Sequence, residues 1–305
     1  MQINSKTLNV GIIGKGNFSD DMIRGFLDKK MFGLCCGLQS HSNYENLLPL
    51  RNYEELDRAV DAVLIFDPTF CLYENLVEVI KSCKHIYVAD TAHMSNHQLK
   101  RLSRYAHEAG VHIQISNGLR FQNIHNDIKD MDLEPRIVEC NHYMRRPSNK
   151  RKVSLINDLL LPDIDIVLSM TKSRVKHVSA TGVGVLYEDP DVVNARVEFY
   201  NGCVATISAS KIADKEVHKF RFFQNDKYHT LNFQNQSLRV VSGADIPLHM
   251  EEIDVEEQMD DTTNYHKIIN RQEILEKEIE SFYYCIVLGT EPVLGIDEFI
   301  ASRTV

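Results

Sequence analysis

The sequence predicts an α/β protein in which a doubly wound parallel sheet is followed by a second, α+β domain. Strand-like and helix-like segments alternate five times between residues 8 and 116, with short connections. After residue 123 strand-like runs dominate, and Asn201-Gly202 between two alternating runs is a strong hairpin signal. Because the chain has 305 residues, two domains with sizeable cores fit its length. We expect residues 1–122 and 123–305 to form them.

The first domain has five predicted strands, each a short apolar run rich in β-branched residues. These are Leu8–Gly14, Phe32–Leu38, Ala62–Phe66, His85–Val88 and Val111–Ser116. Helical spacing of apolar residues predicts helices at Ser19–Asp28, Tyr53–Ala59, Leu72–Cys83 and Asn96–Ala109. Asn52 and Ser95 are suitable N-caps, and Gly110 suits the position after a helix end. Parallel strands joined by right-handed crossovers, with helices on both faces, follow from this alternation.

The second domain is predicted to be an open, mainly antiparallel sheet with helices on one face. Helical stretches are expected at Val153–Met170, interrupted by Pro162, and at Ile269–Leu288, ending at Gly289. The closing helix could pack back on the first domain. An acidic loop, Glu251–Asp261, precedes it. The predicted strands are Arg136–Tyr143, Val175–Leu186, Val192–Phe199, Cys203–Ser210, Lys219–Gln224, Tyr228–Phe233 and Leu238–Val241.

Composition excludes several classes of protein. A net charge of -9 argues against a nucleic-acid binder, which needs a basic face. No apolar run approaches the roughly 20 residues that span a bilayer, and the polar Met1–Asn9 lacks the pattern of a signal peptide. The seven cysteines show neither a Cys-x-x-Cys pair nor zinc spacing. We therefore expect a cytoplasmic protein with reduced thiols, no structural metal, and no nucleic-acid or membrane partner.

The first strand ends in Gly14-x-Gly16-x-x-Ser19, which opens a helix. Gly14 permits a tight turn, and Gly16 lets the backbone approach a pyrophosphate at the helix N-terminus. In this context the turn predicts a dinucleotide site of the Rossmann type. Asp20 and Asp21 oppose it, because carboxylates in the first helical turn repel a phosphate. A turn that no longer binds a dinucleotide tightly is therefore an equally open interpretation.

A series of short sequence blocks runs through nearly the whole chain. In order, they are Val10-Gly-Ile-Ile-Gly-x-Gly, Asp61-Ala-Val, Pro68-Thr69, Tyr73-Glu74, Lys84-His85-Ile-Tyr-Val, Arg120-Phe121, Asp158-x-x-x-Pro162-Asp163-Ile-Asp165, Asn194-Ala-Arg-Val-Glu-Phe, Asn201-Gly-Cys, Glu278-x-x-x-Phe282 and Gly289-Thr-Glu-Pro292. In these blocks and in their order the chain resembles a known family, the glucose-fructose oxidoreductase, inositol dehydrogenase and MocA (Gfo/Idh/MocA) family.

The resemblance implies NAD or NADP as the cofactor and a sugar, polyol or nucleotide sugar as the small-molecule ligand. It also implies a homodimer or homotetramer formed through the second-domain sheet. Gln39-Ser40-His41 stands where an NAD site normally has an acid for the ribose 2′-hydroxyl, so the choice between NAD and NADP stays open. The cofactor-binding residues implied are Gly14, Gly16, Asn17, Phe18, Ser19, Gln39, Ser40, Asp67, Pro68, Thr69, Asn117 and Arg120.

Departures from the family concern the catalytic residues. The family's catalytic lysine matches Asp90, and its catalytic histidine, four residues after Asp158, matches Pro162. Hydride removal from an alcohol needs a base for the hydroxyl proton and a cation near the developing alkoxide. Proline supplies neither, and a carboxylate opposes the alkoxide. The substitute candidates are Asp90, Asp158 and His93, and for His93 a surface loop histidine is the other interpretation.

Further polar residues in the second domain could face a cleft. His142 lies in a predicted strand and could face either a cleft or the core. Asp163 and Asp165 are too close in sequence to share one helix face, which argues against a paired-carboxylate site. Two hypotheses follow. One is a catalytically impaired family member that binds a nucleotide or sugar ligand as a sensor, scaffold or partner. The other is an active NAD(P)-dependent oxidoreductase with non-standard catalytic residues.

Overall fold

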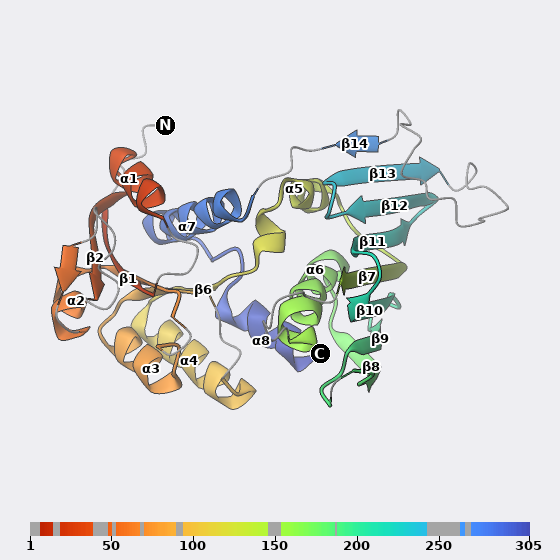
Figure 1. Ribbon diagram of the computed structural model, residues 1–305, viewed down its shortest axis with the longest axis horizontal. Coiled ribbons are helices and arrows are strands. Elements are labelled where there is room, and N and C mark those ends of the chain that lie inside the picture. The colour runs from red at the N-terminus through yellow and green to blue at the C-terminus, as the bar shows by residue number, and fades with distance from the viewer. Residues whose placement is uncertain are drawn as a thin grey trace. The chain divides into compact units, whose positions relative to one another are not determined.

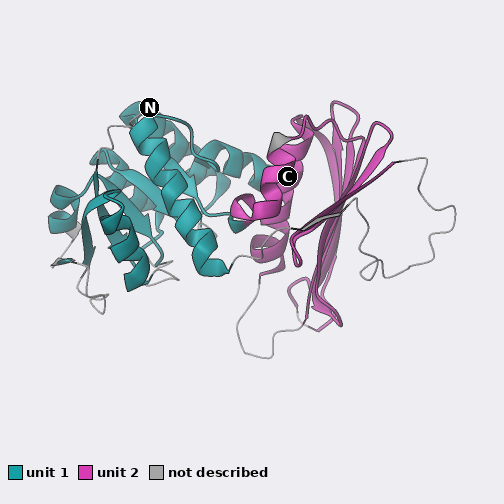
Figure 2. Ribbon diagram, turned by 90° about the horizontal axis from the view of Figure 1, so that it is seen from above, with its two compact units in different colours: residues 1–118, 270–304 teal, residues 119–269, 305 magenta. Residues whose placement is uncertain are grey.

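A computed structural model describes residues 7–14, 19–38, 48–50, 53–67, 70–89, 94–145, 154–186, 188–242, 263–265 and 270–305. The chain folds into two compact units (Figure 2). Unit 1 consists of residues 1–118 and 270–304, and unit 2 of residues 119–269 with Val305. No helix among the described residues is both long enough and apolar enough to cross a bilayer.

Unit 1 is built on a six-stranded, fully parallel sheet (Figure 1). Its strand order is β3-β2-β1-β4-β5-β6, so the direction of strand addition reverses between β1 and β4. This confirms the predicted doubly wound sheet. The strands are β1 (Leu8–Ile13), β2 (Phe32–Leu38), β3 (Leu48–Leu50), β4 (Ala62–Ile65), β5 (His85–Val88) and β6 (Ile113–Ile115).

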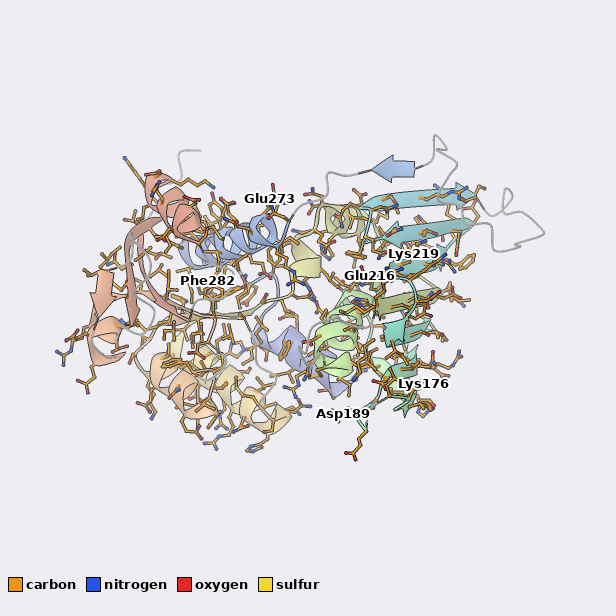
Figure 3. All side chains as sticks on the ribbon, in the orientation of Figure 1. Lys176, Asp189, Glu216, Lys219, Glu273 and Phe282 are labelled. Carbon is orange, nitrogen blue, oxygen red and sulfur yellow. The ribbon has the colours of Figure 1, made fainter. Side chains whose placement is uncertain are left out.

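Helices cover both faces of this sheet (Figure 1). One face carries α1 (Asp20–Asp28) and α7 (Arg271–Leu288), whose apolar side chains share a core with β1. Figure 3 shows Glu273 near the start of α7 and Phe282 further along it; Phe282 is buried in that core. The remaining helices of the unit are α2 (Tyr53–Ala59), α3 (Tyr73–Lys81), α4 (Asn96–Ala109) and α8 (Ile296–Thr304).

Both ends of helix α4 are determined by residues of the local sequence. Ser95 and Gln98 form a capping box, in which each side chain bonds the other residue's backbone. At the other end Gly110 has φ 66°, a left-handed conformation that suits glycine. Helix α7 repeats this arrangement, with Asn270 and Glu273 at its start and Gly289 at φ 64° after its end. Each predicted boundary of α4 is thereby confirmed.

Unit 2 is built on an eight-stranded sheet of order β14-β13-β12-β11-β7-β10-β9-β8. Only β7 and β10 pair in parallel; the other neighbours are antiparallel. The predicted Asn201-Gly202 hairpin joins β9 to β10. The strands are β7 (Ile137–Arg145), β8 (Val175–Val183), β9 (Val192–Phe199), β10 (Val204–Ala213), β11 (Val217–Gln224), β12 (Lys227–Asn232), β13 (Ser237–Ser242) and β14 (Thr263–Tyr265).

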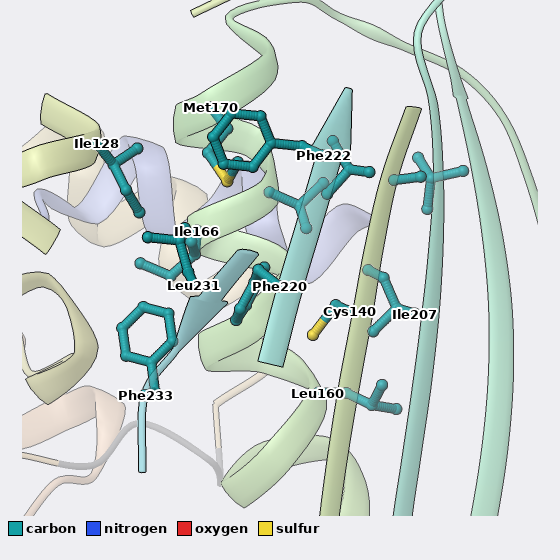
Figure 4. Close-up of a cluster of buried hydrophobic side chains, with 14 of the residues drawn as sticks. Ile128, Cys140, Leu160, Ile166, Met170, Ile207, Phe220, Phe222, Leu231 and Phe233 are labelled. Carbon is teal, nitrogen blue, oxygen red and sulfur yellow. The ribbon is translucent and has the colours of Figure 1, made fainter. Parts of the chain in front are cut away.

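Helices α5 (Asn123–Asp130) and α6 (Leu161–Thr171) pack on one face of this sheet, as predicted. Figure 4 shows the core between them, where Ile128 and Ile166 lie among the side chains of several strands. Along β11 the buried side chains alternate, so that Phe220 and Phe222 are fully buried whereas Phe223 is 37% exposed. This period of two is that of a strand with one covered face.

Several sequence expectations need correction. Among the described residues, β3, α5, α8, β14 and the short 3₁₀ helix Gly118–Phe121 were not anticipated from the sequence. The predicted strand Val175–Leu186 ends at Val183, and Val111–Ser116 is a strand only over Ile113–Ile115. The helical stretch predicted at Val153–Met170 changes type beside Pro162: a π-helical segment, Leu155–Leu160, is followed by α6, of which Pro162 is the second residue.

Candidate functional site

The turn after β1 requires glycine at position 14. Gly14 has φ 91°, and a Cβ on it would lie 2.3 Å from the backbone nitrogen of Asp67. The same strand end is joined to β4, because the N–H groups of Phe66 and Asp67 both donate to the carbonyl of Ile13. Gly14 and Asp67 therefore meet at the carboxyl ends of β1 and β4, where the strand order reverses. In open α/β sheets this is the position at which ligands bind.

Ser19 begins α1 and is occupied in capping it. Its hydroxyl accepts a hydrogen bond from the Met22 N–H at 3.3 Å and another from the Gln272 side chain at 2.9 Å. Asp20 and Asp21 stand in the first turn, as the sequence shows. Among the described residues, no donor reaches the buried Oδ1 atom of Asp20. Carboxylates here compete with any phosphate for the positive end of the helix.

Many of the predicted site residues lie outside the described part of the chain. These are Gly16, Asn17, Phe18, Gln39, Ser40, Pro68, Thr69, Asp90 and His93. Their roles stay predictions from the sequence. The acidic loop Glu251–Asp261 and the predicted cap Asn52 also lie outside it.

A buried carboxyl group that sequence reasoning missed lies in unit 1. Glu278 of α7 is 3% exposed and accepts hydrogen bonds from the hydroxyls of Tyr87, at 2.8 Å, and Ser116, at 3.0 Å. The backbone N–H of Asn117 also donates to it. Burial raises the pKa of Glu278 to about 7, against the opposing effect of these donors. In the sequence, the one signal that could have pointed to Glu278 was its place in the Glu278-x-x-x-Phe282 block.

Asp158 and Pro162 lie in the segment that leads into α6. The Asp158 carboxylate accepts the Ser154 N–H at 2.9 Å, and the Ser154 hydroxyl accepts the Asn157 N–H at 3.2 Å. Asp158 is therefore engaged in closing its own helical turn. The side chain of Pro162 has no group that can accept or release a proton.

Arg120 and Asp165 form a buried ion pair within unit 2. The guanidinium donates through Nε and an Nη to the two carboxylate oxygens, at 2.6 and 2.7 Å, and the side chains are 13% and 4% exposed. Such two-point pairing fixes both groups. Burial and the neighbouring Arg120 lower the pKa of His125 to about 4, so its imidazole is neutral. Arg120 as a cofactor contact stays a prediction.

Asp163 does not pair with Asp165 but holds two imidazoles. Its oxygens lie 2.8 Å from His142 Nδ1 and 2.8 Å from His218 Nε2. The two rings are stacked, with centroids 3.8 Å apart and an interplanar angle of 11°. Burial would raise the pKa of Asp163, but the two histidines outweigh it and lower the pKa to about 2. The question of where His142 points is answered: it faces this cluster, under the helix α6.

A surface groove of about 760 Å³ lies between α3 and α4. Tyr73, Arg101 and Tyr105 are among its lining residues, and Arg101 donates to the Tyr105 hydroxyl at 2.8 Å. None of the predicted cofactor or catalytic residues in the described ranges lines it. The groove is therefore separate from the predicted dinucleotide site.

Comparison with known proteins finds a curated relative and solved structures of similar fold, but no model of a known protein family matches the chain. A curated relative, the UDP-N-acetylglucosamine 3-dehydrogenase of Acidithiobacillus ferrooxidans, is 24% identical over 185 residues. That match spans 59% of this chain and 58% of the relative, less than two thirds of the relative's length.

Solved structures of oxidoreductases share the fold over nearly the whole chain. A structure of the same A. ferrooxidans enzyme has a TM-score of 0.81 at 17% identity, covering 98% of this chain and 95% of that one. An NAD-binding oxidoreductase from Klebsiella pneumoniae has a TM-score of 0.80 at 14% identity, covering 97% and 94%. An Agrobacterium radiobacter oxidoreductase, solved with NAD⁺, L-tartaric acid and magnesium, has 0.76 at 13%, covering 97% and 93%. The chain thus has the fold of NAD-binding oxidoreductases.

Proposed function

We propose that this protein binds NAD or NADP at the carboxyl edge of the unit 1 sheet and takes a nucleotide-sugar ligand, but oxidises alcohols poorly. The observation that carries the cofactor assignment is the contact between Gly14 and Asp67. A Cβ at position 14 would collide with the Asp67 backbone, so glycine is what allows the ends of β1 and β4 to approach closely and form this edge. The ligand class is taken from the A. ferrooxidans relative.

The residues of this edge fit a dinucleotide in part. Gly14, Ser19 and Asp67, with the predicted Gly16 and Thr69, would hold it. When bound, a nicotinamide cofactor supplies hydride transfer. The first-turn carboxylates of Asp20 and Asp21 lower the expected affinity, since they lie at the helix end that would otherwise attract phosphate. We therefore expect binding weaker than in relatives that lack these acids.

We expect weak alcohol oxidation because the side chains that would take the hydroxyl proton are missing. Pro162 replaces the family's histidine, and Asp90 replaces its lysine. The acids nearest to Pro162 cannot take over freely, because Asp158 closes a helical turn, Asp163 holds two imidazoles and Asp165 is paired with Arg120. General acid–base help is typically worth about 10²–10⁴-fold in rate, so its loss leaves a sensor, scaffold or partner role as the better proposal.

An active NAD(P)-dependent oxidoreductase with non-standard catalytic residues is the second candidate. The similarity to a UDP-N-acetylglucosamine 3-dehydrogenase over 185 residues favours it. The two candidates differ in one measurable quantity, the turnover of a nucleotide sugar by the wild-type protein.

Calorimetric titration with NADH and NADPH tests the cofactor site. We expect saturable binding of at least one of them, and at least a tenfold loss of affinity in Gly14→Ala, which is about 1.4 kcal/mol. Gly25→Ala is the matched control, because a Cβ there meets nothing within 4 Å. Absence of binding to the wild type would overturn the cofactor assignment.

Turnover with UDP-N-acetylglucosamine and NAD⁺ or NADP⁺ separates the two candidates. The impaired protein should show little turnover, and Asp90→Lys combined with Pro162→His should raise it. A wild-type rate equal to that of the A. ferrooxidans enzyme would instead establish the second candidate. A double variant that binds cofactor yet gains no activity would leave the impaired-enzyme account without support.

A further inference from the structure

His142, Asp163 and His218 come from three different elements of unit 2. His142 is on β7, Asp163 is in the first turn of α6, and His218 is on β11 next to β7. His142 and His218 stand directly opposite each other in the β7–β11 ladder, which is why their rings can stack. The carboxylate of α6 is placed over both. This arrangement brings together two nitrogens and two oxygens that are far apart in sequence.

The distances suit a small divalent ion. One ligand atom from each of the three residues can be chosen so that all lie within 4.8 Å of one another. Zinc bound at about 2.0–2.1 Å by imidazole nitrogen and carboxylate oxygen needs its ligand atoms roughly 3–3.5 Å apart in a tetrahedral site. Each ring nitrogen is already 2.8 Å from an Asp163 oxygen. To coordinate one ion the two rings, which are stacked with an interplanar angle of 11°, would have to tilt so that the lone pairs of both nitrogens point at it.

The proton balance of such binding is simple. In the ion-free cluster each ring places one nitrogen towards an Asp163 oxygen. When an ion takes those two nitrogens, each imidazole carries its proton on the other ring nitrogen, Nε2 in His142 and Nδ1 in His218. The dipositive charge of the ion is partly balanced by the buried carboxylate of Asp163.

The surroundings favour a softer ion over magnesium or calcium. Cys140 lies two residues before His142 on the same face of β7, and its buried thiol hydrogen-bonds Asp163. The Phe233 ring stacks on His218 at 5.0 Å and closes that side with an apolar surface. Imidazole nitrogen with a nearby thiol is typical of zinc, cobalt or nickel, whereas magnesium and calcium prefer all-oxygen sites with water.

We propose that His142, Asp163 and His218 bind a divalent transition-metal ion of the zinc type, leaving a coordination position for water or a ligand. The assignment concerns unit 2 alone and does not depend on the proposed cofactor. No sequence pattern pointed to a metal here. Asp163 is 21 residues from His142 and 55 residues from His218, so the three ligands form no short motif. His142 is 17% exposed at its side chain, which gives an ion a route of entry.

Cobalt substitution of the 305-residue protein tests the proposal. Protein treated with a chelator and then desalted is titrated with Co²⁺, and the visible spectrum is recorded. We expect one equivalent to bind with the intense ligand-field bands of a four-coordinate site, and Zn²⁺ to displace it. A weak, octahedral-type spectrum, or binding only at millimolar ion, would overturn the proposal, and this measurement needs no variant.

Variants connect the binding to the cluster. Asp163→Asn and His142→Gln should each weaken Co²⁺ binding at least tenfold and abolish the rise in melting temperature caused by Zn²⁺. His229→Asn is the matched control, because His229 is also buried in this sheet but stacks on Phe222 outside the cluster. Equal binding by Asp163→Asn and wild type would refute the site. So would an equal thermal shift with Mg²⁺.

Discussion

Glu278 shows how a single buried carboxyl group makes stability depend on pH. Three donors surround it, from Tyr87, Ser116 and the Asn117 backbone, yet burial is the larger effect and raises its pKa from an ordinary 4.5 to about 7. A group whose pKa is higher in the folded state than in the unfolded state contributes fully to stability when the pH is below its unfolded-state pKa. That contribution is lost as the pH rises through its folded-state pKa.

Replacing Glu278 by Gln should remove this pH dependence. Between pH 5 and pH 8 the wild type should lose about 2 kcal/mol of unfolding free energy relative to Glu278→Gln. Urea unfolding at the two pH values measures the difference. Glu276→Gln is the control, since Glu276 is an exposed partner of Lys29. A difference between wild type and Glu278→Gln that is the same at both pH values would show that Glu278 ionises normally.

At the scale of helices and strands, much of the fold could be predicted from the sequence. The capped helix α4 and the alternating strands β9 to β12 carry their signals locally, in Ser95, Gly110 and the Asn201-Gly202 turn. The short strands β3 and β14 carry none, since three residues give no period and their pairing depends on neighbours distant in sequence. Helix α5, only eight residues long, was missed for a similar reason.

The candidate site was less predictable than the fold, because most of its contacts join residues that are distant in sequence. Gly14 could be recognised because a tight turn after a strand needs glycine at that position. The partners of Asp163, Asp165 and Glu278 could not, because they are distant in sequence and meet these carboxylates only through tertiary packing. His142 and His218 come together through strand pairing, which no spacing in the sequence reports.

Gly25 inside α1 and Gly110 directly after α4 should respond oppositely to replacement by alanine. Gly25 lies within α1 with open space at its Cβ position, so Gly25→Ala should stabilise the protein by about 0.5–1 kcal/mol. Gly110 has φ 66°, and Gly110→Ala should destabilise it by about 1–2 kcal/mol. Denaturant unfolding followed by circular dichroism compares them. If both variants changed stability in the same direction, the assigned end of α4 would be wrong.

Neighbouring phenylalanines on β11 test which face of the sheet is covered. Phe222 is fully buried and stacks on His229, so Phe222→Ala should cost about 3–5 kcal/mol. Phe223 is partly exposed, and its ring contacts Tyr228, so Phe223→Ala should cost about 1 kcal/mol. Thermal unfolding measures both. Equal losses would contradict the alternation of this strand.

Considering the whole chain, the two units should respond oppositely to acid. The raised pKa of Glu278 strengthens unit 1 as the pH falls towards 5. In unit 2 the pKa of His125 is lowered from 6.5 to about 4, so its stabilising contribution is present above pH 6.5 and is lost as the pH falls. Each effect amounts to about 2 kcal/mol between pH 8 and pH 5.

Hydrogen exchange measured peptide by peptide tests the opposite pH responses of the two units directly. After correction for the intrinsic exchange rate, protection at pH 5 relative to pH 8 should rise in β1 and β5 and fall in α5 and β13. His125→Gln should abolish the fall in unit 2 without changing unit 1. Parallel changes in both units would contradict the assignment of these two groups.

Unit 1 is discontinuous, and this has a consequence for synthesis on the ribosome. Residues 8–115 contain every strand of its sheet, but Ile279 and Phe282, which cover one face of that sheet, belong to α7. Until α7 has left the exit tunnel, that face of the nascent domain lacks its cover, and its apolar side chains remain accessible to chaperones. Unit 1 is therefore completed only after the sequence of unit 2 has already emerged.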